Sequence, residues 1–175
     1  ISIMKLTNTL DAGPVSNIYK IKLDQSDNAE VISKKLSFLA AEKILDELDD
    51  ILEEKAKFID QDHSKASYAN KIKKSEGQIN WNENALKIIG KINGLFPVPG
   101  AFFNFGGERY KILKAEIGNG KGGIGEVITD SLEIACRDNK SIKILEIQRE
   151  GKRSQKIGEF MLGSQIKKGS VISNA

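Results

Sequence analysis

The chain has 175 residues, of which 39% are hydrophobic and 29% charged, as is typical of a soluble globular protein of one or two domains. No apolar run approaches the ~18 residues of a membrane span, and no segment reads as a secretory signal. The only cysteine, Cys136, and the only histidine, His63, exclude disulfide frameworks and His/Cys metal cages, so we expect no metal and a reducing, cytoplasmic compartment.

Charge is distributed unevenly along the chain. Residues 1–63 carry 8 Lys/Arg and 13 Asp/Glu, a net charge of −5, whereas residues 64–175 carry 19 and 11, a net charge of +8. This asymmetry favours two modules, the second with a polyanionic partner. The alternative is that the lysines only keep a β domain in solution.

The first third predicts two strands and a helical region. The chain begins with Ile1 and enters an alternating pattern at once, so we expect it to be part of a longer protein. Residues 8–14 form a turn by composition, and 15–23 predict a second strand. From 28 to 52 apolar residues recur every three or four positions, which predicts one amphipathic helix with a buried face, or two helices broken near Ala40. We interpret its acidic residues as a solvated face: Asp46, Glu47, Asp49, Asp50, Glu53 and Glu54.

The middle of the chain contains its clearest folding signal. Residues 60–78 are polar and predict a linker. After the single tryptophan, Trp81, residues 85–93 show helical spacing of apolar side chains. Pro97, Pro99 and Gly100 then impose a rigid turn, because proline fixes φ and removes a backbone donor. An extended apolar segment, 101–105, follows.

The last third predicts short strands at 109–117, 126–129, 132–137 and 141–148, with a flexible loop at 118–125 and a short helix at 158–163. Short strands at this spacing, separated by glycine turns, are typical of a small OB-like barrel. We therefore expect an α/β segment followed by a mostly β, OB-like barrel domain.

Two short motifs carry possible chemistry. Asp11 lies in a glycine turn between strands, where it could serve as acid, base or electrostatic anchor, or simply form the turn. The Asp-Ala-Gly sequence lacks the hydroxyl that aspartic proteases use. The loop 118–123 matches G-x-G-x-x-G, but a strand and not a helix is predicted after it, so we interpret the match as coincidental.

Several segments together resemble the methionyl-tRNA formyltransferase family. They are Ile79-Asn80-Trp81, the helix ending near Asn93, Phe96-Pro97 with Pro99-Gly100-Ala101-Phe102, and, further on, Glu146 to Arg153, Phe160 to Gly163 and Lys168-Gly169. The resemblance spans nearly the whole chain. It implies the end of a Rossmann-like formyltransferase catalytic domain at 1–59, a basic linker at 60–78 and a C-terminal OB-like tRNA-binding domain at 79–175.

The resemblance also implies an activity and a set of site residues. The parent enzyme would be a monomer that transfers a formyl group from 10-formyltetrahydrofolate to the amino group of methionine on initiator tRNA. Asp11 would be catalytic, and Thr9, Leu10 and Asp11 would bind the folate. The tRNA would be held mainly through its phosphates by Lys71, Lys73, Lys74, Arg149, Lys152, Arg153, Lys156, Lys167 and Lys168.

The chain departs from the family pattern in ways that keep alternatives open. The Asn-x-His pair expected before the aspartate is missing, and His63 lies downstream of it, so we expect the chain alone to be inactive. Residues 136–139 lack the usual glycine turn. The alternatives are a non-enzymatic OB-like RNA-binding module, or another 10-formyltetrahydrofolate-dependent formyltransferase that acts on a nucleotide sugar or on glycinamide ribonucleotide.

Overall fold

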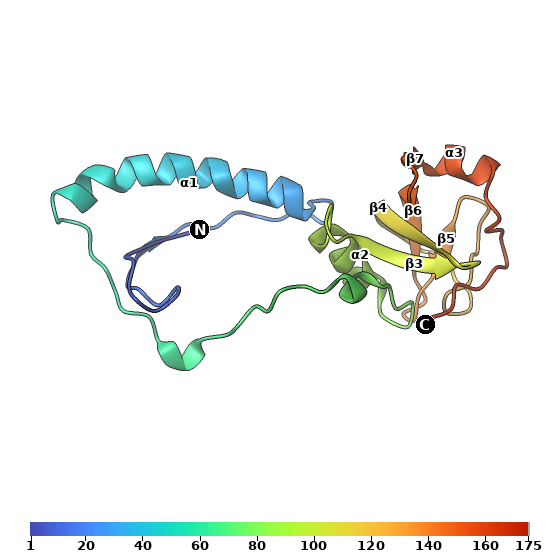
Figure 1. Ribbon diagram of the computed structural model, residues 1–175, viewed down its shortest axis with the longest axis horizontal. Coiled ribbons are helices and arrows are strands. Elements are labelled where there is room, and N and C mark those ends of the chain that lie inside the picture. Colours follow the sequence, from blue (N-terminus) through green and yellow to red (C-terminus); the bar gives the residue numbers. More distant parts are fainter. Residues whose placement is uncertain (175) are drawn as a thin grey trace. The chain divides into compact units, whose positions relative to one another are not determined.

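The computed structural model of the chain describes residues 1–174, which form two compact units (Figure 1). Unit 1 comprises residues 1–25 and 30–71, and unit 2 comprises residues 26–29 and the chain from 72 onward. Within the described residues, no helix is both long and apolar enough to cross a membrane.

Unit 1 consists of a small hairpin and one long helix. Strands β1 (Ser2–Met4) and β2 (Val15–Ile18) pair antiparallel. Helix α1 runs without interruption over Ala29–Leu52, and a 3₁₀ turn, η1, covers His63–Lys65. Ile59 bridges back to Val15 and so joins the segment after α1 to the hairpin.

Three predictions for unit 1 are wrong in detail, whereas the single-helix alternative for α1 is confirmed. The second strand ends at Ile18 instead of continuing to residue 23, and α1 has no break near Ala40. The predicted buried apolar face of α1 is not buried within the described chain, since side chains such as Phe38 and Leu45 are 66% and 71% exposed. The one buried residue of α1 is Glu47, which the sequence placed on the solvated face.

Unit 2 is built around a curled antiparallel sheet (Figure 1). Its strand order is β3-β4-β6-β5. Strand β5 pairs with the first part of β6, and β7 pairs with the later part of the same edge of β6. The elements are η2 (Lys74–Gly77), α2 (Ala85–Gly94), β3 (Ala101–Phe105), β4 (Glu108–Gly118), β5 (Glu133–Ala135), β6 (Ser141–Arg149), β7 (Ser154–Lys156) and α3 (Ile157–Leu162).

Helix α2 begins where its sequence provides caps. The Asn84 side chain accepts a hydrogen bond from the Lys87 N–H at 2.8 Å, and the Asp138 carboxylate accepts from the Ala85 N–H at 3.2 Å. Such caps satisfy donors that the first helical turn leaves unpaired. The helix packs its buried face against β4 and β6 and ends before the proline turn. This confirms the predicted helix and turn.

The core of the described chain lies entirely in unit 2, from Ile79 onward. Four aromatic rings form its spine: Trp81 contacts Phe103, Phe103 stacks on Tyr110, and Tyr110 meets Phe160, with centroids 6.0, 5.5 and 5.7 Å apart. Aromatic pairs at these distances add to the stability gained from burial. Aromatic residues that precede and follow α2 in the sequence thus pack into one core.

The strand predictions for unit 2 are largely confirmed, with two exceptions. The segment 126–129 is not a strand, because Glu126 and Val127 make only isolated bridges, to Val171 and Ile134. Strand β7 was not predicted. The register of β4 against β6 also shifts between Ile112 and Ala115, which reverses the alternation along β4.

Candidate functional site

The Asp11 turn in unit 1 is held in an unusual backbone conformation. Asp11 has φ +52°, in the left-handed region that residues other than glycine seldom adopt. The Ala12 N–H donates to the Thr9 carbonyl at 3.4 Å, and the Lys5 N–H donates to the Pro14 carbonyl at 3.0 Å. A Cβ at Gly13 would overlap the Lys5 carbonyl, so this position requires glycine.

Gln61 clamps this turn from far along the sequence. Its side-chain nitrogen donates to the Asp11 carbonyl at 2.8 Å and to the Gly13 carbonyl at 2.7 Å. The two bonds use both hydrogens of one amide group, so a single side chain fixes both sides of the turn. No local sequence pattern predicts this contact, because about fifty residues separate the partners.

The side chains of the turn point into solvent. Thr9, Leu10 and Asp11 are all exposed, Leu10 to 89%. Among the described residues the Asp11 carboxylate has no hydrogen-bond or ion-pair partner, and none of the three lines a pocket. A folate binding at this turn would therefore need groups beyond those that unit 1 gathers there.

Buried Glu47 anchors the strand that follows the turn. Its carboxylate accepts hydrogen bonds from Ser16 at 3.3 Å, from Asn17 at 2.7 Å and from the Tyr19 hydroxyl. The bond to Glu47 raises the pKa of Tyr19, because it stabilises the protonated phenol. Three donors from one short segment thus explain why a carboxylate of the acidic run is buried.

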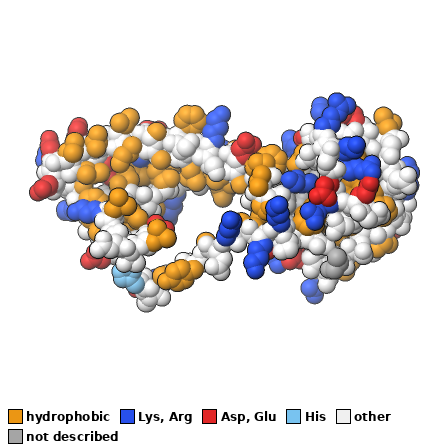
Figure 2. Space-filling model, viewed as in Figure 1, with side chains coloured by type: hydrophobic (Ala, Val, Ile, Leu, Met, Phe, Trp, Pro, Cys, Tyr) orange, Lys and Arg blue, Asp and Glu red, His pale blue; other side chains and the backbone are white. Residues whose placement is uncertain are grey.

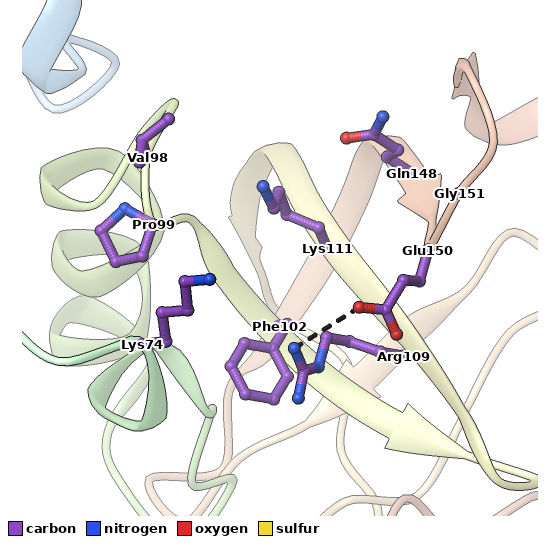
Figure 3. Close-up of a pocket in the computed structure, with 9 residues that line it drawn as sticks. All are labelled: Lys74, Val98, Pro99, Phe102, Arg109, Lys111, Gln148, Glu150 and Gly151. Carbon is purple, nitrogen blue, oxygen red and sulfur yellow. Dashed lines mark ion pairs between the residues drawn. The ribbon is translucent and has the colours of Figure 1, made fainter.

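Unit 2 contains a pocket of about 360 Å³ on the outer face of the sheet (Figure 3). Its walls come from η2, the proline turn, β3, β4 and the end of β6. The lining residues are Lys74, Val98, Pro99, Phe102, Arg109, Lys111, Gln148, Glu150 and Gly151.

Strand pairing explains how these residues meet. Phe102 pairs with Lys111, and Lys111 pairs with Gln148, so the three side chains lie side by side across β3, β4 and β6. The Arg109 guanidinium lies over the Phe102 ring, 4.3 Å from its centroid, and forms an ion pair with Glu150 at 3.6 Å (Figure 3).

The pocket is electropositive. It contains three cationic side chains and one carboxylate, and that carboxylate is paired with Arg109. Neither Lys74 nor Lys111 has an ion-pair partner among the described residues. Two unpaired ammonium groups facing one concavity favour an anionic ligand.

The structure separates the predicted basic residues. Lys74 alone lines the pocket, and Lys152 lies at its edge, where its carbonyl accepts a bond from Gln148 at 2.8 Å. Arg149 forms an ion pair with Glu108, whose pKa is lowered by its bonds to Tyr110 and Arg149. The others are exposed and line no pocket: Lys71 at the end of unit 1, Lys73 before η2, Arg153 in the β6–β7 turn, Lys156 in β7, and Lys167 and Lys168 after α3.

Sequence reasoning missed Arg109 and Lys111 as site residues. Both lie in β4 and alternate with buried Tyr110 and Ile112, so their outward direction follows from the period of a strand. What the sequence could not show is that Lys74, a distant residue, would face the same cavity. Figure 2 shows Lys and Arg side chains spread over the visible face of unit 2.

Other candidate features do not form sites. Within the described residues no cluster of three or more His, Cys, Asp or Glu side chains could hold a metal. A second hollow near the start of α2 is lined by groups that already cap the helix or pair with each other, such as Asp138 and the Lys87–Glu83 pair. The element after the glycine-rich loop is strand β5, so the loop does not open the helix that a dinucleotide motif requires.

A family model described as the C-terminal domain of formyl transferases matches residues 71–165. A methionyl-tRNA formyltransferase of Pelagibacter ubique (strain HTCC1062) is 63% identical over 174 residues, covering 99% of this chain and 56% of that protein. One from Rickettsia massiliae (strain Mtu5) is 36% identical over 177 residues, covering 98% of this chain and 57% of that protein. The chain thus spans just over half the length of the curated relatives it matches.

Solved structures share the fold at lower identity. HypX from Aquifex aeolicus in complex with tetrahydrofolic acid aligns with a TM-score of 0.68 and 18% identity, over 93% of this chain and 29% of that chain. An N-formyltransferase from Helicobacter canadensis aligns with a TM-score of 0.67 and 17% identity, over 85% of this chain and 54% of that chain. At these identities the likeness concerns the fold alone.

Proposed function

This chain belongs to the formyl transferase family, and we propose from that premise that it is the C-terminal part of a methionyl-tRNA formyltransferase. The observation that carries the proposal is the 63% identity to the Pelagibacter protein of that name, over nearly the whole chain. The parent enzyme would use 10-formyltetrahydrofolate as donor and the methionine of initiator tRNA as acceptor.

In this reaction the methionine amine attacks the formyl carbon, and the bond from that carbon to the folate nitrogen breaks. One proton leaves the amine, and the released folate nitrogen gains one. We assign Asp11 to the handling of this proton, with Thr9 and Leu10 beside the folate. The rigid turn supports the assignment, because a catalytic group must be held in place before the substrate arrives.

The proposed organisation follows from the two units. Residues 1–59 would complete a Rossmann-like catalytic domain, 60–78 would be a basic linker, and 79–175 an OB-like domain that grips tRNA. The break between units at 71/72 and the curled antiparallel sheet support this division. We further propose that the protein acts as a cytoplasmic monomer.

The proposal for Asp11 is tested by the Asp11→Asn variant of the full-length parent enzyme. We expect a loss of turnover on the order of a hundredfold or more, with little change in tRNA affinity, because a positioned acid–base group is lost. Asp49→Asn, on an exposed position of α1, is the matched control. Near-normal turnover would reduce Asp11 to a structural turn residue.

A second assay tests the assignment of the activity. The purified 175-residue chain should not formylate Met-tRNA, because most of the folate site lies outside it, whereas the parent enzyme should. Offering the parent enzyme an amino sugar nucleotide or glycinamide ribonucleotide instead of Met-tRNA distinguishes the other formyltransferases. RNA binding without any formyl transfer by the parent would favour a non-enzymatic RNA-binding module.

A further inference from the structure

The pocket of unit 2 has an ionic side and an apolar side. Lys74, Lys111 and the Arg109–Glu150 pair supply the charge. Val98 and Pro99, from the proline turn, supply an apolar wall, and Val98 is 81% exposed. A volume of about 360 Å³ is far larger than one phosphate group needs and lies in the range of small-molecule sites.

We propose that this pocket binds one unpaired nucleotide of an RNA partner. Its phosphate would lie between Lys74 and Lys111, and its base would stack on the Arg109 guanidinium, against Val98 and Pro99. The inference rests on the proposed tRNA function only in taking RNA as the partner.

The phosphate assignment follows from the pairing of charges. The pocket's carboxylate is already engaged by Arg109, while both lysines remain unpaired in the described chain. A bound phosphate therefore meets two ammonium groups that need not first leave another partner.

The stacking assignment follows from the position of Arg109. Its guanidinium lies over the Phe102 ring, 4.3 Å from the ring centroid, and a guanidinium is a flat group on which other flat groups stack. Unpaired RNA bases stack on arginine planes and aromatic rings, whereas duplex RNA presents backbone and 2′-hydroxyl groups to a protein. The sugar-phosphate backbone of duplex RNA would leave the apolar Val98 side chain exposed to water, whereas an unpaired base would cover it.

The pocket is formed before any ligand arrives. The Ile79 N–H donates to the Phe102 carbonyl at 2.8 Å, which fixes the segment after η2 against β3. At Gly77 a Cβ would overlap the Gly100 carbonyl, so the two segments touch through their backbones. Gly100 has φ +83°, and a Cβ there would lie 2.6 Å from the Lys111 side chain. These close contacts between backbone segments keep Lys74 and Lys111 in the lining of the same pocket.

The test compares two labelled probes on the full 175-residue chain, a single-stranded uridine octamer and an RNA duplex of eight base pairs. Arg109→Lys keeps the charge and loses the flat stacking face. We expect this variant to weaken binding of the octamer roughly tenfold, with the duplex affinity and the salt dependence of binding unchanged. Lys74→Ala with Lys111→Ala should weaken octamer binding and flatten its salt dependence.

The Val98→Ser variant is a second test of the base contact, because the exposed Val98 side chain can be shortened without disturbing the core. It should weaken binding of the octamer only, and Lys140→Ala, which removes an exposed lysine outside the pocket, is the control. Equal losses for both probes in Arg109→Lys, or no loss for either, would overturn the nucleotide site while leaving RNA binding intact. If the unmodified chain bound neither these probes nor tRNA, the proposed tRNA function would fail instead.

Discussion

Gln61 is the side chain that connects the far end of unit 1 to the Asp11 turn. Its two hydrogen bonds hold the carbonyls on either side of Ala12, in a turn where Asp11 already adopts a positive φ. A strained residue persists only where its surroundings fix it. If Asp11 is catalytic, Gln61 is therefore a positioning residue for it.

We predict that Gln61→Ala in the parent enzyme lowers kcat about tenfold and leaves the KM for tRNA unchanged, because the turn loses its clamp but no substrate contact. Gln61→Glu has the same shape but no side-chain N–H donor, so it should behave in the same way. Lys57→Ala, an exposed neighbour, is the control. A rise in KM without loss of kcat would show that Gln61 contacts substrate instead.

Cys136 shows how burial decides reactivity. Burial raises the pKa of its thiol to about 12, and the nearby Asp138 adds to this. Only the thiolate reacts with alkylating agents, and at pH 8 a thiol of this pKa is ionised to about one part in ten thousand. We predict that iodoacetamide modifies the folded chain about a thousandfold more slowly than the urea-unfolded chain. Equal rates would mean that Cys136 becomes exposed in the native state.

The glycine-rich loop between β4 and β5 packs closely over buried side chains. Glu133 is buried and accepts hydrogen bonds from Ser141 and from the Gly120 N–H at 3.3 Å. Side chains added at Gly118 or Gly120 would overlap this carboxylate or its neighbours. The loop thus needs small residues to lie over the buried Glu133–Ser141 pair.

We predict opposite effects for two glycine substitutions. Gly125 has φ +79°, and a Cβ there would overlap the Ile172 carbonyl, so Gly125→Ala should lower the free energy of unfolding by about 1–3 kcal/mol. Gly90 lies in α2 with nothing within 4 Å of an added Cβ, so Gly90→Ala should raise it by about 0.5–1 kcal/mol. Urea unfolding measures both, and a destabilised Gly90→Ala would contradict the packing of α2.

Local patterns predicted the elements whose packing is decided within their own sequence. The apolar spacing before the proline turn predicted α2, the apolar run after that turn predicted β3, alternation predicted β4, and a short-strand pattern predicted β6. Features that depend on distant partners could not be predicted. Strand β7 is short and polar and exists because β6 offers it an edge, and Glu47 is buried because Ser16, Asn17 and Tyr19 reach it.

The same reason explains what sequence reasoning achieved for the candidate sites. The Asp11 turn could be identified from the sequence, because its glycine and proline are adjacent. Lys74 could be identified as one member of a cluster of lysines. Sequence reasoning missed Arg109 and Lys111, because their role depends on a cavity closed by the proline turn and η2. It also missed Gln61, whose partners lie at the other end of unit 1.

The two units differ in what holds them together. Unit 2 contains all the buried hydrophobic residues of the described chain, whereas apolar side chains along α1 remain exposed or half-buried (Figure 2). The charge follows the same division, since unit 2 carries 17 Lys/Arg against 12 Asp/Glu, whereas unit 1 is acidic. The unit with its own core is thus also the one suited to a polyanion.

Most of the binding free energy between such a domain and tRNA should come from counterion release, so affinity should fall steeply as salt rises. Lys71, Lys73 and Lys74 lie in sequence where the two units meet, and all three are exposed. We predict that replacing them with alanine weakens binding to all tRNAs alike, because phosphate contacts carry no sequence information. Each lost contact should flatten the slope of log K against log salt by roughly 0.7–0.9.

Binding titrations of the parent enzyme at several salt concentrations measure this slope. The matched control replaces Lys20, Lys22 and Lys57 of unit 1, which removes the same charge from the acidic part of the chain. If only net charge mattered, both triple variants would lose affinity equally and both slopes would fall together. A flattened slope in the Lys71, Lys73 and Lys74 variant alone would locate the phosphate contacts at residues 71–74, where the sequence passes from unit 1 to unit 2. An unchanged slope there would mean that these lysines only keep the segment solvated, and that the tRNA is held by the sheet and its turns.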